Sequence, residues 1–348
     1  MKEFKIGSRR IGPGEPVFFL AEIGLNHNGD LDLAARLIRS AAKTGAEGVK
    51  FQTYHAETLA DPINNPKLYE IFKSCELSRD AHFKLREICD RENVYFISTP
   101  FDEESVDLLV ECGIPAFKVA SGDLTNIPLL QKIGSFARPV IMSTGMGFMD
   151  EIVAAIKTLK KSGAENILPL HCVSSYPPDE AEINLKSITS MRDSLGCPVG
   201  YSDHYVGSLA AFGAVILGAV LIEKHFTESK NLPGPDQRLS ADEGELRTII
   251  DQTRLLEKML GNGIKQPSTK ERSIRQLGRR GIYAAIDIPK GVVIIKSHLK
   301  LARPEGDMPA SRVVDILGSL TKCSIPAGTS ISEKYLEKSQ ATSCTIEC

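Results

Sequence analysis

Eight short apolar segments recur between residues 17 and 226, and most of them are followed by an amphipathic stretch of helical length. Each is rich in branched or aromatic side chains, which is typical of strands that are covered on both faces in a parallel sheet. The segments are VFFLAEIG (17–24), GVKFQTY (48–54), VYFISTPF (94–101), AFKVAS (116–121), PVIMSTG (139–145), ILPLHC (167–172), PVGYSDH (198–204) and VLIEKHF (220–226). Eight strands alternating with helices over about 250 residues predict an α/β fold of the (β/α)8 TIM-barrel type.

An open, doubly wound α/β sheet is the main alternative, because it also alternates strands with helices. No GxGxxG sequence follows the first apolar segment, which weakens the dinucleotide-binding form of that fold. The stretch between the second and third segments (56–93) is long, so we expect an extra loop or helix there, over the mouth of the barrel.

The character of the sequence changes after residue 261. Residues 262–281 are polar, basic and contain several glycines, which predicts a linker. Short β-like pieces such as IYAAIDI and SIPAGTSI follow, so we expect residues 282–348 to form a small, mostly β domain after a barrel domain of residues 1–261. The last residues, TSCTIEC, are predicted to be a loose tail.

Charge and cysteine content narrow the function and the compartment. The 42 Lys and Arg residues nearly balance the 44 Asp and Glu residues, which argues against a nucleic-acid binder or a polybasic membrane binder. The longest weakly polar run (208–222) is shorter than the roughly 20 residues of a membrane-spanning helix. The cysteines are scattered without a CxxC pair, and the first residues lack the apolar core of a signal peptide. These features predict a cytoplasmic protein with reduced thiols.

Polar side chains gather at the carboxyl ends of the predicted strands, which is where the active site of a (β/α)8 barrel lies. Because strand residues two apart share a face, Ser202 lies with His204, and Glu223 lies with His225. The polar side chains at the strand ends are Glu22, Lys50, Gln52, Ser98, Thr99, Lys118, Ser121, Asp123, Ser143, Thr144, His171, Tyr176, Ser202, His204, Glu223 and His225. We therefore expect an active site at this end of the barrel.

His204 and His225 follow consecutive predicted strands, so neighbouring strands would bring their imidazoles together. Two imidazoles that converge in a wet barrel mouth form a candidate site for a divalent metal, with water or substrate as the remaining ligands. The alternative is that each histidine is a hydrogen-bonded structural residue. The placement of both histidines at the ends of consecutive strands favours the metal site over the structural alternative.

Lys50 and Lys118 are expected on the inward faces of the second and fourth strands. A buried lysine requires a bound anion or a Schiff-base role to offset its desolvation. Nearby hydroxyl groups favour a cradle for phosphate or carboxylate; they belong to Thr99, Ser121, Ser143 and Ser202. The candidates for contacts with sugar hydroxyls and for a general base are the carboxylates of Glu22, Asp123, Glu223 and Asp236. Any one of these can instead orient a neighbouring group.

Nine motifs, in order and spaced by the barrel period, closely resemble the sialic acid synthase family, the phosphoenolpyruvate-dependent synthases of nonulosonic acids. The motifs are AEIGLNHNGD, GAEGVKFQTY, ISTPF, FKVASGD, IMSTGM, LHCVSSYP, GYSDH, IEKHF and PGPDQRLS. The resemblance runs from about residue 17 to the C-terminus, since the last part is similar to the family's antifreeze-like (SAF) domain. It implies a transferase that joins phosphoenolpyruvate to an open-chain N-acetylhexosamine, using a divalent metal such as manganese, with magnesium or cobalt as alternatives.

The resemblance also implies roles for single residues. Positions that hold phosphoenolpyruvate in the family match Lys50, Thr99, Lys118, Ser121, Ser143 and Ser202, and the metal ligands match His204 and His225. Residues around the sugar and the metal match Glu22, Tyr176, Glu223 and Asp236. Arg303, in LARPEG, matches an arginine that the small domain sends into the partner subunit's active site, which implies a domain-swapped homodimer. Asp123 and Ser174 also lie near the sugar, but some family members have Glu and Asn there, which leaves the acceptor open.

The expected reaction is N-acetylneuraminate synthesis from phosphoenolpyruvate, N-acetylmannosamine and water, with release of phosphate by C–O cleavage. Legionaminic and pseudaminic acid synthases, which use a 6-deoxy diacetamido hexose, are the alternatives, although NHNG and PGPD resemble the sialic and legionaminic branches more than the pseudaminic branch. More distant alternatives are a 3-deoxy-ulosonate phosphate synthase, a Schiff-base aldolase that uses Lys50 or Lys118, and an ice- or glycan-binding module on an inert barrel.

Overall fold

The computed structural model describes residues 4–337, and these divide into two compact units, one up to Gly261 and one from Asn262 onward. The predicted tail, TSCTIEC, lies outside the described residues. No helix in the described part of the chain is long and apolar enough to cross a membrane.

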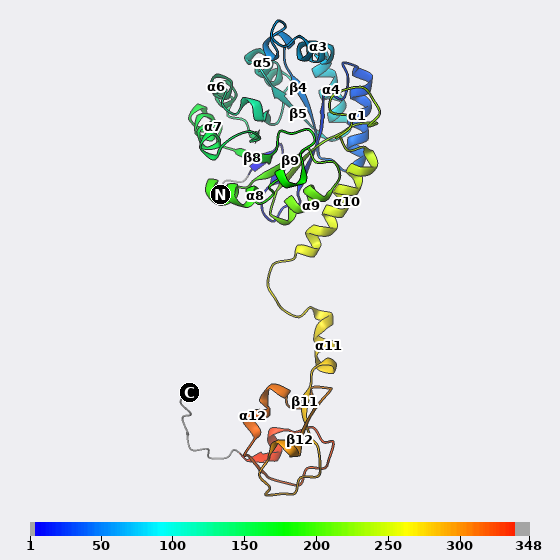
Figure 1. The fold of residues 1–348 in the computed structure, drawn as a ribbon, viewed down its shortest axis with the longest axis vertical. Coiled ribbons are helices and arrows are strands. Elements are labelled where there is room, and N and C mark those ends of the chain that lie inside the picture. Colours follow the sequence, from blue (N-terminus) through cyan, green and yellow to red (C-terminus); the bar gives the residue numbers. More distant parts are fainter. Residues whose placement is uncertain (1–3, 338–348) are drawn as a thin grey trace. The chain divides into compact units, whose positions relative to one another are not determined.

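The first unit is a closed barrel of parallel strands surrounded by helices, which confirms the predicted (β/α)8 fold (Figure 1). The barrel strands are β3 (Phe18–Gly24), β4 (Gly48–Thr53), β5 (Tyr95–Pro100), β6 (Phe117–Val119), β7 (Val140–Ser143), β8 (Ile167–Cys172), β9 (Gly200–Asp203) and β10 (Leu221–His225). They follow one another around the barrel in chain order, and β10 pairs with β3 to close it. All eight carboxyl ends therefore meet at one mouth.

Apart from two helices in the long connection between β4 and β5, the helices of this unit pack their apolar faces on the outside of the barrel. They are α1 (Leu31–Thr44), α2 (Ala56–Leu59), α3 (Pro66–Cys75), α4 (Arg79–Arg91), α5 (Glu103–Glu111), α6 (Ile127–Ser135), α7 (Met149–Ser162), α8 (Ser187–Leu195), α9 (Leu209–Ile216) and α10 (Glu243–Leu260). The Asp30 side chain caps the first turn of α1, and Gly45 ends the helix in the left-handed conformation. One large core fills the layer between helices and strands, with members such as Leu37, Phe51 and Ile222.

A short antiparallel hairpin closes the barrel at the end away from the mouth. It consists of β1 (Phe4–Ile6) and β2 (Arg9–Ile11). Its side chains pack against residues at the start of the strands, including Phe18 and Leu221, in a separate buried cluster. The amino end of the barrel is thus filled with apolar side chains, which leaves polar chemistry to the carboxyl end.

The long connection between β4 and β5 holds three helices, as the sequence predicts an insertion there. α3 begins at Pro66, which follows the capping side chain of Asn65. The inner face of α3 reaches the mouth of the barrel, where its side chains line a cavity.

The second unit is small and mostly β, as expected. Its strands pair antiparallel, β11 (Gly281–Ala284) with β12 (Leu299–Ala302) and β13 (Leu320–Thr321) with β14 (Leu336–Glu337), and one short helix, α12 (Val313–Ile316), lies among them. Its own buried cluster includes Ile282, Ile294 and Ile325. The stretch 262–281, expected to be a linker, contains a helix, α11 (Thr269–Gly278). Ser268 and Glu271 form a capping box that stabilises its first turn. The prediction of a linker, which followed from the polar composition, did not take this helix-start pattern into account.

Candidate active site

A cavity of about 460 Å³ opens at the mouth of the barrel, and it collects nearly all of the residues predicted from the strand ends. The predicted residues that line it are Glu22, Lys50, Thr99, Lys118, Ser121, Ser143, Ser174, Tyr176, Ser202, His204, Glu223, His225 and Asp236. They come from β3 to β10 and from the loops that follow these strands. Parallel pairing explains the convergence, since the register sets Glu22 beside both Lys50 and His225 and sets Ser202 beside Glu223.

Some predicted residues do not line this cavity: Ser98, Thr144 and His171 among the strand-end side chains, and Asp123 and Arg303 among the residues expected to bind the sugar. Asp123 lies in a short 3₁₀ turn (Ser121–Asp123), and its carboxylate accepts a hydrogen bond of 3.0 Å from the Asn126 side chain. Arg303 lies in the second unit, directly after β12, where its side chain is exposed. Their expected roles in sugar binding remain predictions.

Two lysines and two glutamates form a buried charged cluster at the base of the cavity. The Lys50 Nζ lies 3.0 Å from a Glu22 oxygen and 3.7 Å from Glu223 Oε1, and the Lys118 Nζ lies 3.6 Å from the same Glu223 oxygen. Lys118 also donates to the Ser143 hydroxyl at 2.6 Å. All four charged side chains are buried. Water is therefore largely replaced by fixed charges where a small anion could bind.

Burial and mutual charge shift the pKa values of this cluster in opposite directions. Burial raises the pKa of Glu22 to about 7, although Lys50 works against the shift. Burial also lowers the pKa of Lys118. Burial alone would raise the pKa of Glu223, but the charges of Lys118 and Lys50 outweigh it and lower the pKa. One carboxyl can therefore exchange a proton near neutral pH while the other stays ionised, a common division of roles in active sites.

The two histidines meet at the rim of this cluster, with ring centroids 5.2 Å apart. The His204 Nδ1 lies 2.7 Å from the Val173 carbonyl oxygen, which can only accept, so Nδ1 carries the proton and Nε2 is left as a ligand atom. The His225 Nδ1 is buried, has no hydrogen-bond partner in the described part of the chain, and lies 3.9 Å from Asp236 Oδ2. The described residues hold no group of three or more His, Cys, Asp or Glu side chains arranged to bind a metal ion. A metal held by these two imidazoles would therefore take its other ligands from water or substrate.

The loop that carries Asp236 is fastened to the barrel by a buried set of amide and hydroxyl groups, here called the Asn26 latch (Asn26, Thr227, Gln237 and Ser240). The Asn26 side chain donates to the Phe226 carbonyl and to the Ser240 hydroxyl, both at 2.8 Å. Gln237 donates to the Asn26 carbonyl at 3.1 Å and accepts from Thr227. The latch joins the loops after β3 and β10 and fixes Asp236 beside His225.

The strand-end prediction is wrong at β8. His171 points away from the cavity, where its Nε2 lies 2.7 Å from the Ile183 carbonyl and its ring stacks on Tyr201. Its neighbour Cys172 lines the cavity instead. Counting in steps of two from the buried Leu168 would have identified Cys172.

Gln52, Cys172 and a set of apolar side chains also line the cavity, although no role was predicted for them from sequence. Gln52 shares the face of Lys50 and donates to Glu22 at 3.5 Å. Burial alone would raise the pKa of the Cys172 thiol, but contacts with His204 and Ser121 and the charge of Lys118 lower it. The apolar residues are Leu25, Leu68, Ile71, Phe72, Phe101 and Met146, several of which come from α3 and carry no motif that points to a site.

Gly145, two residues after the end of β7, allows the backbone to approach the cavity closely. Its N–H donates to the Ser121 hydroxyl at 3.0 Å. A Cβ atom at this position would lie 2.3 Å from the Ser174 hydroxyl and 2.9 Å from that of Ser121. The glycine therefore leaves both serine side chains free to turn toward a ligand.

Comparison with known proteins identifies the family of the chain. The NeuB family model matches residues 37–265, and the SAF domain model matches residues 279–337. An uncharacterized protein of Methanocaldococcus jannaschii is 46% identical over 304 residues, 87% of this chain and 90% of its own length. The N,N'-diacetyllegionaminic acid synthase of Legionella pneumophila is 40% identical over 347 residues, 95% of this chain and 98% of its own length.

A solved structure supports the same assignment. The N-acetylneuraminic acid (sialic acid) synthetase of Leptospira borgpetersenii, crystallised with citrate, is 37% identical, with a TM-score of 0.75 over 78% of this chain and 95% of its own. The family models together span both units of the fold. The chain belongs to the NeuB family of phosphoenolpyruvate-dependent, carbon–carbon bond-forming synthases, and it carries a SAF domain.

Proposed function

We propose that this enzyme is a nonulosonic acid synthase that condenses phosphoenolpyruvate with an open-chain N-acetylated hexosamine and water, releasing phosphate by C–O cleavage. The observation that carries the proposal is the buried pair of lysines beside two converging imidazoles in one cavity of a NeuB-family barrel. The cationic groups suit a small dianion, and the imidazoles suit a divalent metal.

Phosphoenolpyruvate is assigned to the base of the cavity. Lys50 and Lys118 provide the positive charge, and four hydroxyl groups can donate to phosphate and carboxylate oxygens. These belong to Thr99, Ser121, Ser143 and Ser202. Three of them already contact the charged cluster: Thr99 lies 3.4 Å from the Lys50 Nζ, Ser143 accepts from Lys118 at 2.6 Å, and Ser202 donates to Glu223 at 2.9 Å. The cluster is thus preorganised to hold and orient the enol carbon C3.

His204 and His225 would hold the metal, for which manganese is our first choice and magnesium or cobalt are alternatives. The Nδ1 of His225, which has no hydrogen-bond partner within residues 4–337, and the fixed tautomer of His204 both fit a metal ligand. Such an ion, when bound, acts as a Lewis acid that polarises the aldehyde of the acceptor. Asp236 and Tyr176, next to the two imidazoles, are assigned to orient the acceptor hydroxyls.

The chemical steps require charge stabilisation and proton transfer by the chain. C3 of phosphoenolpyruvate attacks the aldehyde carbon, a new C–C bond forms as the C=O π bond breaks, and the aldehyde oxygen takes up a proton from Glu22 in its acid form. Glu223, kept ionised by its two lysines, stabilises the positive charge left at C2. Water adds at C2 and gives its proton to Glu22, whose pKa of about 7 suits a general base at neutral pH. The bond from C2 to the phosphate oxygen then breaks and its electron pair leaves with phosphate, which takes up the proton of the C2 hydroxyl as C2 becomes a ketone.

We propose that the acceptor is the 6-deoxy diacetamido hexose of the legionaminic branch. Two observations favour it over N-acetylmannosamine, the acceptor expected from sequence. The legionaminic acid synthase is 40% identical over 95% of this chain, and the cavity has an apolar side formed by residues such as Leu68, Ile71 and Phe72. Among the described residues that line the cavity, Lys50 and Lys118 are the only lysines or arginines, which disfavours a phosphorylated acceptor.

A phosphate-release assay across acceptors tests this proposal. Phosphoenolpyruvate and manganese would be offered with the 6-deoxy diacetamido hexoses of the legionaminic and pseudaminic branches and with N-acetylmannosamine. We expect release with at least one of them, highest with the legionaminic acceptor. Oxygen-18 in the bridging position of phosphoenolpyruvate should appear in phosphate. Absence of release with every acceptor, or label retained in the sugar product, would contradict the proposed reaction.

A Schiff-base aldolase is the second candidate, and the lowered pKa of the Lys118 amine favours it. The same amine, however, donates to Ser143 and to the Val119 carbonyl, which occupies it. Borohydride added with pyruvate should leave the protein unmodified if Lys118 is an anion ligand. A covalent adduct on either lysine would instead support the aldolase.

We also propose that the enzyme is a homodimer in which the partner subunit's Arg303 reaches the acceptor. The family resemblance supports this arrangement, and Arg303 is exposed within the SAF unit. Dilution should therefore reduce activity as the dimer dissociates, and a fully active monomer would contradict it. The free thiols of Cys75, Cys89 and Cys112 support the reducing cytoplasm as the compartment in which the enzyme acts.

A further inference from the structure

One face of α3 lines the cavity with apolar side chains, and neither the charged cluster nor the imidazole pair accounts for it. We propose that this face, formed by Leu68, Ile71 and Phe72 and here called the α3 wall, determines acceptor specificity by packing against the methyl groups of the sugar. The inference rests on the proposed function and assigns a role to residues outside the charged cluster.

α3 carries two different faces at helical spacing. Leu68, Ile71 and Phe72 are three and four residues apart and line the cavity together. Tyr69 and Lys73, also four apart, instead contact Glu57, which lies in α2. The helix therefore presents an apolar face to the ligand space and a polar face to the rest of the insertion.

Leu68 and Ile71 are each 38% exposed, although they line the cavity. An apolar side chain left partly in water at a ligand site gains favourable burial when an apolar group covers it. The same cavity is also lined by Lys50, Lys118, Glu22 and Glu223, which belong to the barrel strands. The cavity is thus charged at the end assigned to phosphoenolpyruvate and apolar toward α3, where the non-reacting part of the acceptor would lie. The apolar groups of the candidate acceptors are their acetamido methyl groups and, in the 6-deoxy sugars, the C6 methyl group.

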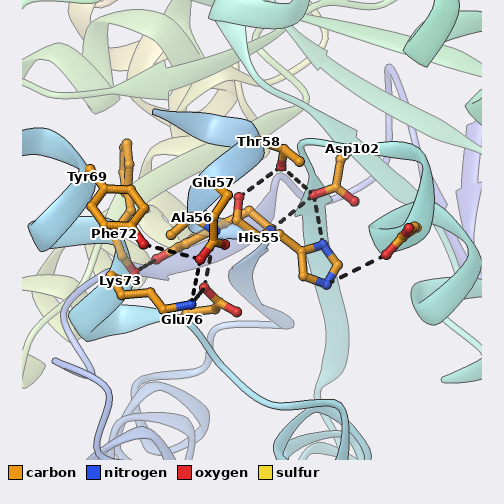
Figure 2. A network of polar contacts seen from close by, with 11 residues as sticks. His55, Ala56, Glu57, Thr58, Tyr69, Phe72, Lys73, Glu76 and Asp102 are labelled. Carbon is orange, nitrogen blue, oxygen red and sulfur yellow. Dashed lines mark hydrogen bonds and ion pairs between the residues drawn. The ribbon is translucent and has the colours of Figure 1, made fainter. Parts of the chain in front are cut away.

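The polar face fixes α3 in place. Figure 2 shows Lys73 between two carboxylates, with its Nζ 3.0 Å from Glu57 and 3.2 Å from Glu76. Tyr69 donates to Glu57 at 3.2 Å, and Glu76 accepts from the Ala56 backbone N–H at 3.1 Å. These contacts hold α3 against α2, so the α3 wall is formed before the ligand binds.

The inner side of α3 is held as well. The Tyr54 hydroxyl donates to the Phe72 carbonyl at 3.0 Å, and the two rings pack at 5.4 Å. Gly29, in a left-handed conformation with φ of 75°, lies against the last turn of the helix. A Cβ atom on Gly29 would come within 2.2 Å of the Ser74 carbonyl oxygen. A side chain at position 29 must therefore displace the end of α3.

The test compares kcat/KM for the 6-deoxy diacetamido hexose of the legionaminic branch and for N-acetylmannosamine, at saturating phosphoenolpyruvate. We expect L68N and I71N each to shift the ratio of the two values about 10-fold toward N-acetylmannosamine, mainly through the acceptor KM, since one methyl group in an apolar pocket contributes about 10- to 200-fold. The KM of phosphoenolpyruvate should not change. The matched control is I63N, which changes an 86% exposed isoleucine of the same insertion that lies outside the cavity lining. It should leave the ratio as in the wild type.

An unchanged ratio in both L68N and I71N would overturn the role of the α3 wall. An equal loss with both acceptors together with a raised KM for phosphoenolpyruvate would also overturn it, because that pattern indicates general damage to the site. A weaker dimer without a change in ratio would assign the face to a second copy of the chain instead. If the asparagine variants fail to fold, L68A and G29A serve in their place, and a ratio unchanged in both would likewise overturn the role. Failure of the proposed function is distinct, since the wild type would then release no phosphate with either acceptor.

Discussion

Two buried lysine–carboxylate sets lie on opposite faces of the barrel wall, an outer pair on β9 and β10 and an inner set that includes Glu223 of β10, and they differ in how completely they are paired. On the outer face of the barrel, the Lys224 Nζ lies 2.8 Å from Asp203 Oδ2 and also donates to the Tyr205 carbonyl. On the inner face, one residue away in the chain, Glu223 has an oxygen with no hydrogen-bond partner in the described part of the protein, and its lysines stand 3.6 and 3.7 Å away.

The difference separates a structural ion pair from a binding site. The outer pair has short contacts and is almost fully buried, at 2% and 0% exposure, so its charges offset each other's desolvation. The inner set has excess hydrogen-bonding capacity and adjoins a cavity, so it can exchange internal contacts for contacts with a ligand. Burial of charge alone would not distinguish the two sets; their pairing does.

The largest effect is expected from breaking the outer pair. K224M should lower the free energy of unfolding by about 3–5 kcal/mol, because it leaves the Asp203 carboxylate buried without its cation. Urea denaturation measures this directly. The double variant D203N/K224M should recover much of the loss, and a K224M protein as stable as the wild type would show that the outer pair is not structural.

The inner set should respond in activity more than in stability. K118M is expected to reduce kcat/KM about 10²- to 10³-fold, the range seen when a preorganised charged or polar donor is removed. Its unfolding free energy should fall less than that of K224M, because Glu223 keeps Lys50 and the hydrogen bond from Ser202. Phosphate release and urea denaturation of the same preparations give both values. Wild-type activity in K118M would show that Lys118 does not contribute to substrate binding or catalysis.

The Asn26 latch should make an intermediate contribution to the free energy of unfolding. N26A removes two buried hydrogen bonds and leaves the Ser240 hydroxyl and the Phe226 carbonyl without that donor, so we expect a loss of about 1–3 kcal/mol. Hydrogen exchange should increase in residues 226–241, which carry Asp236. N231A, an exposed change in the same loop, is the matched control and should have little effect. Unchanged exchange in N26A would contradict a positioning role for the latch.

The smallest expected effect is a pH dependence of stability from Glu22. Because burial raises its folded pKa to about 7, above the ordinary value of 4.5, the folded protein holds a proton that the unfolded chain has lost between these pH values. Glu22 therefore favours unfolding progressively as pH rises from about 4.5 to 7, and its contribution is level above that. Urea denaturation at about pH 5 and about pH 8, on either side of the raised pKa, should show a smaller difference in E22Q than in the wild type. An identical difference in both would contradict the raised pKa.

Much of the fold could be predicted from sequence because the barrel repeats one simple pattern. A continuous apolar strand marks each strand–helix repeat of the barrel. Because side chains alternate between the two faces of a strand, Lys50, Ser202 and Glu223 could be placed on inward faces. The prediction of which residues face the cavity was wrong at β8, where Cys172 rather than His171 lines it. A histidine is equally suited to the polar contacts made outside the sheet.

Other parts of the site depend on contacts that no local pattern encodes. The α3 wall is formed by ordinary helical residues that become significant only because the insertion folds over the barrel mouth. Asp123 follows a strand and yet bonds to Asn126 outside the cavity lining, since a turn redirects it. The position of Arg303 within the SAF unit is described, but its expected contact depends on a second chain.

The contrast between the inner and outer sets is tested most directly by calorimetric titration of phosphoenolpyruvate. We expect the wild type and the folded outer variant D203N/K224M to bind with similar affinity, and K118M to bind at least about 100-fold more weakly. Equal binding by K118M and the wild type, or loss of binding in the folded outer variant alone, would contradict the assignment of the inner set as the substrate site.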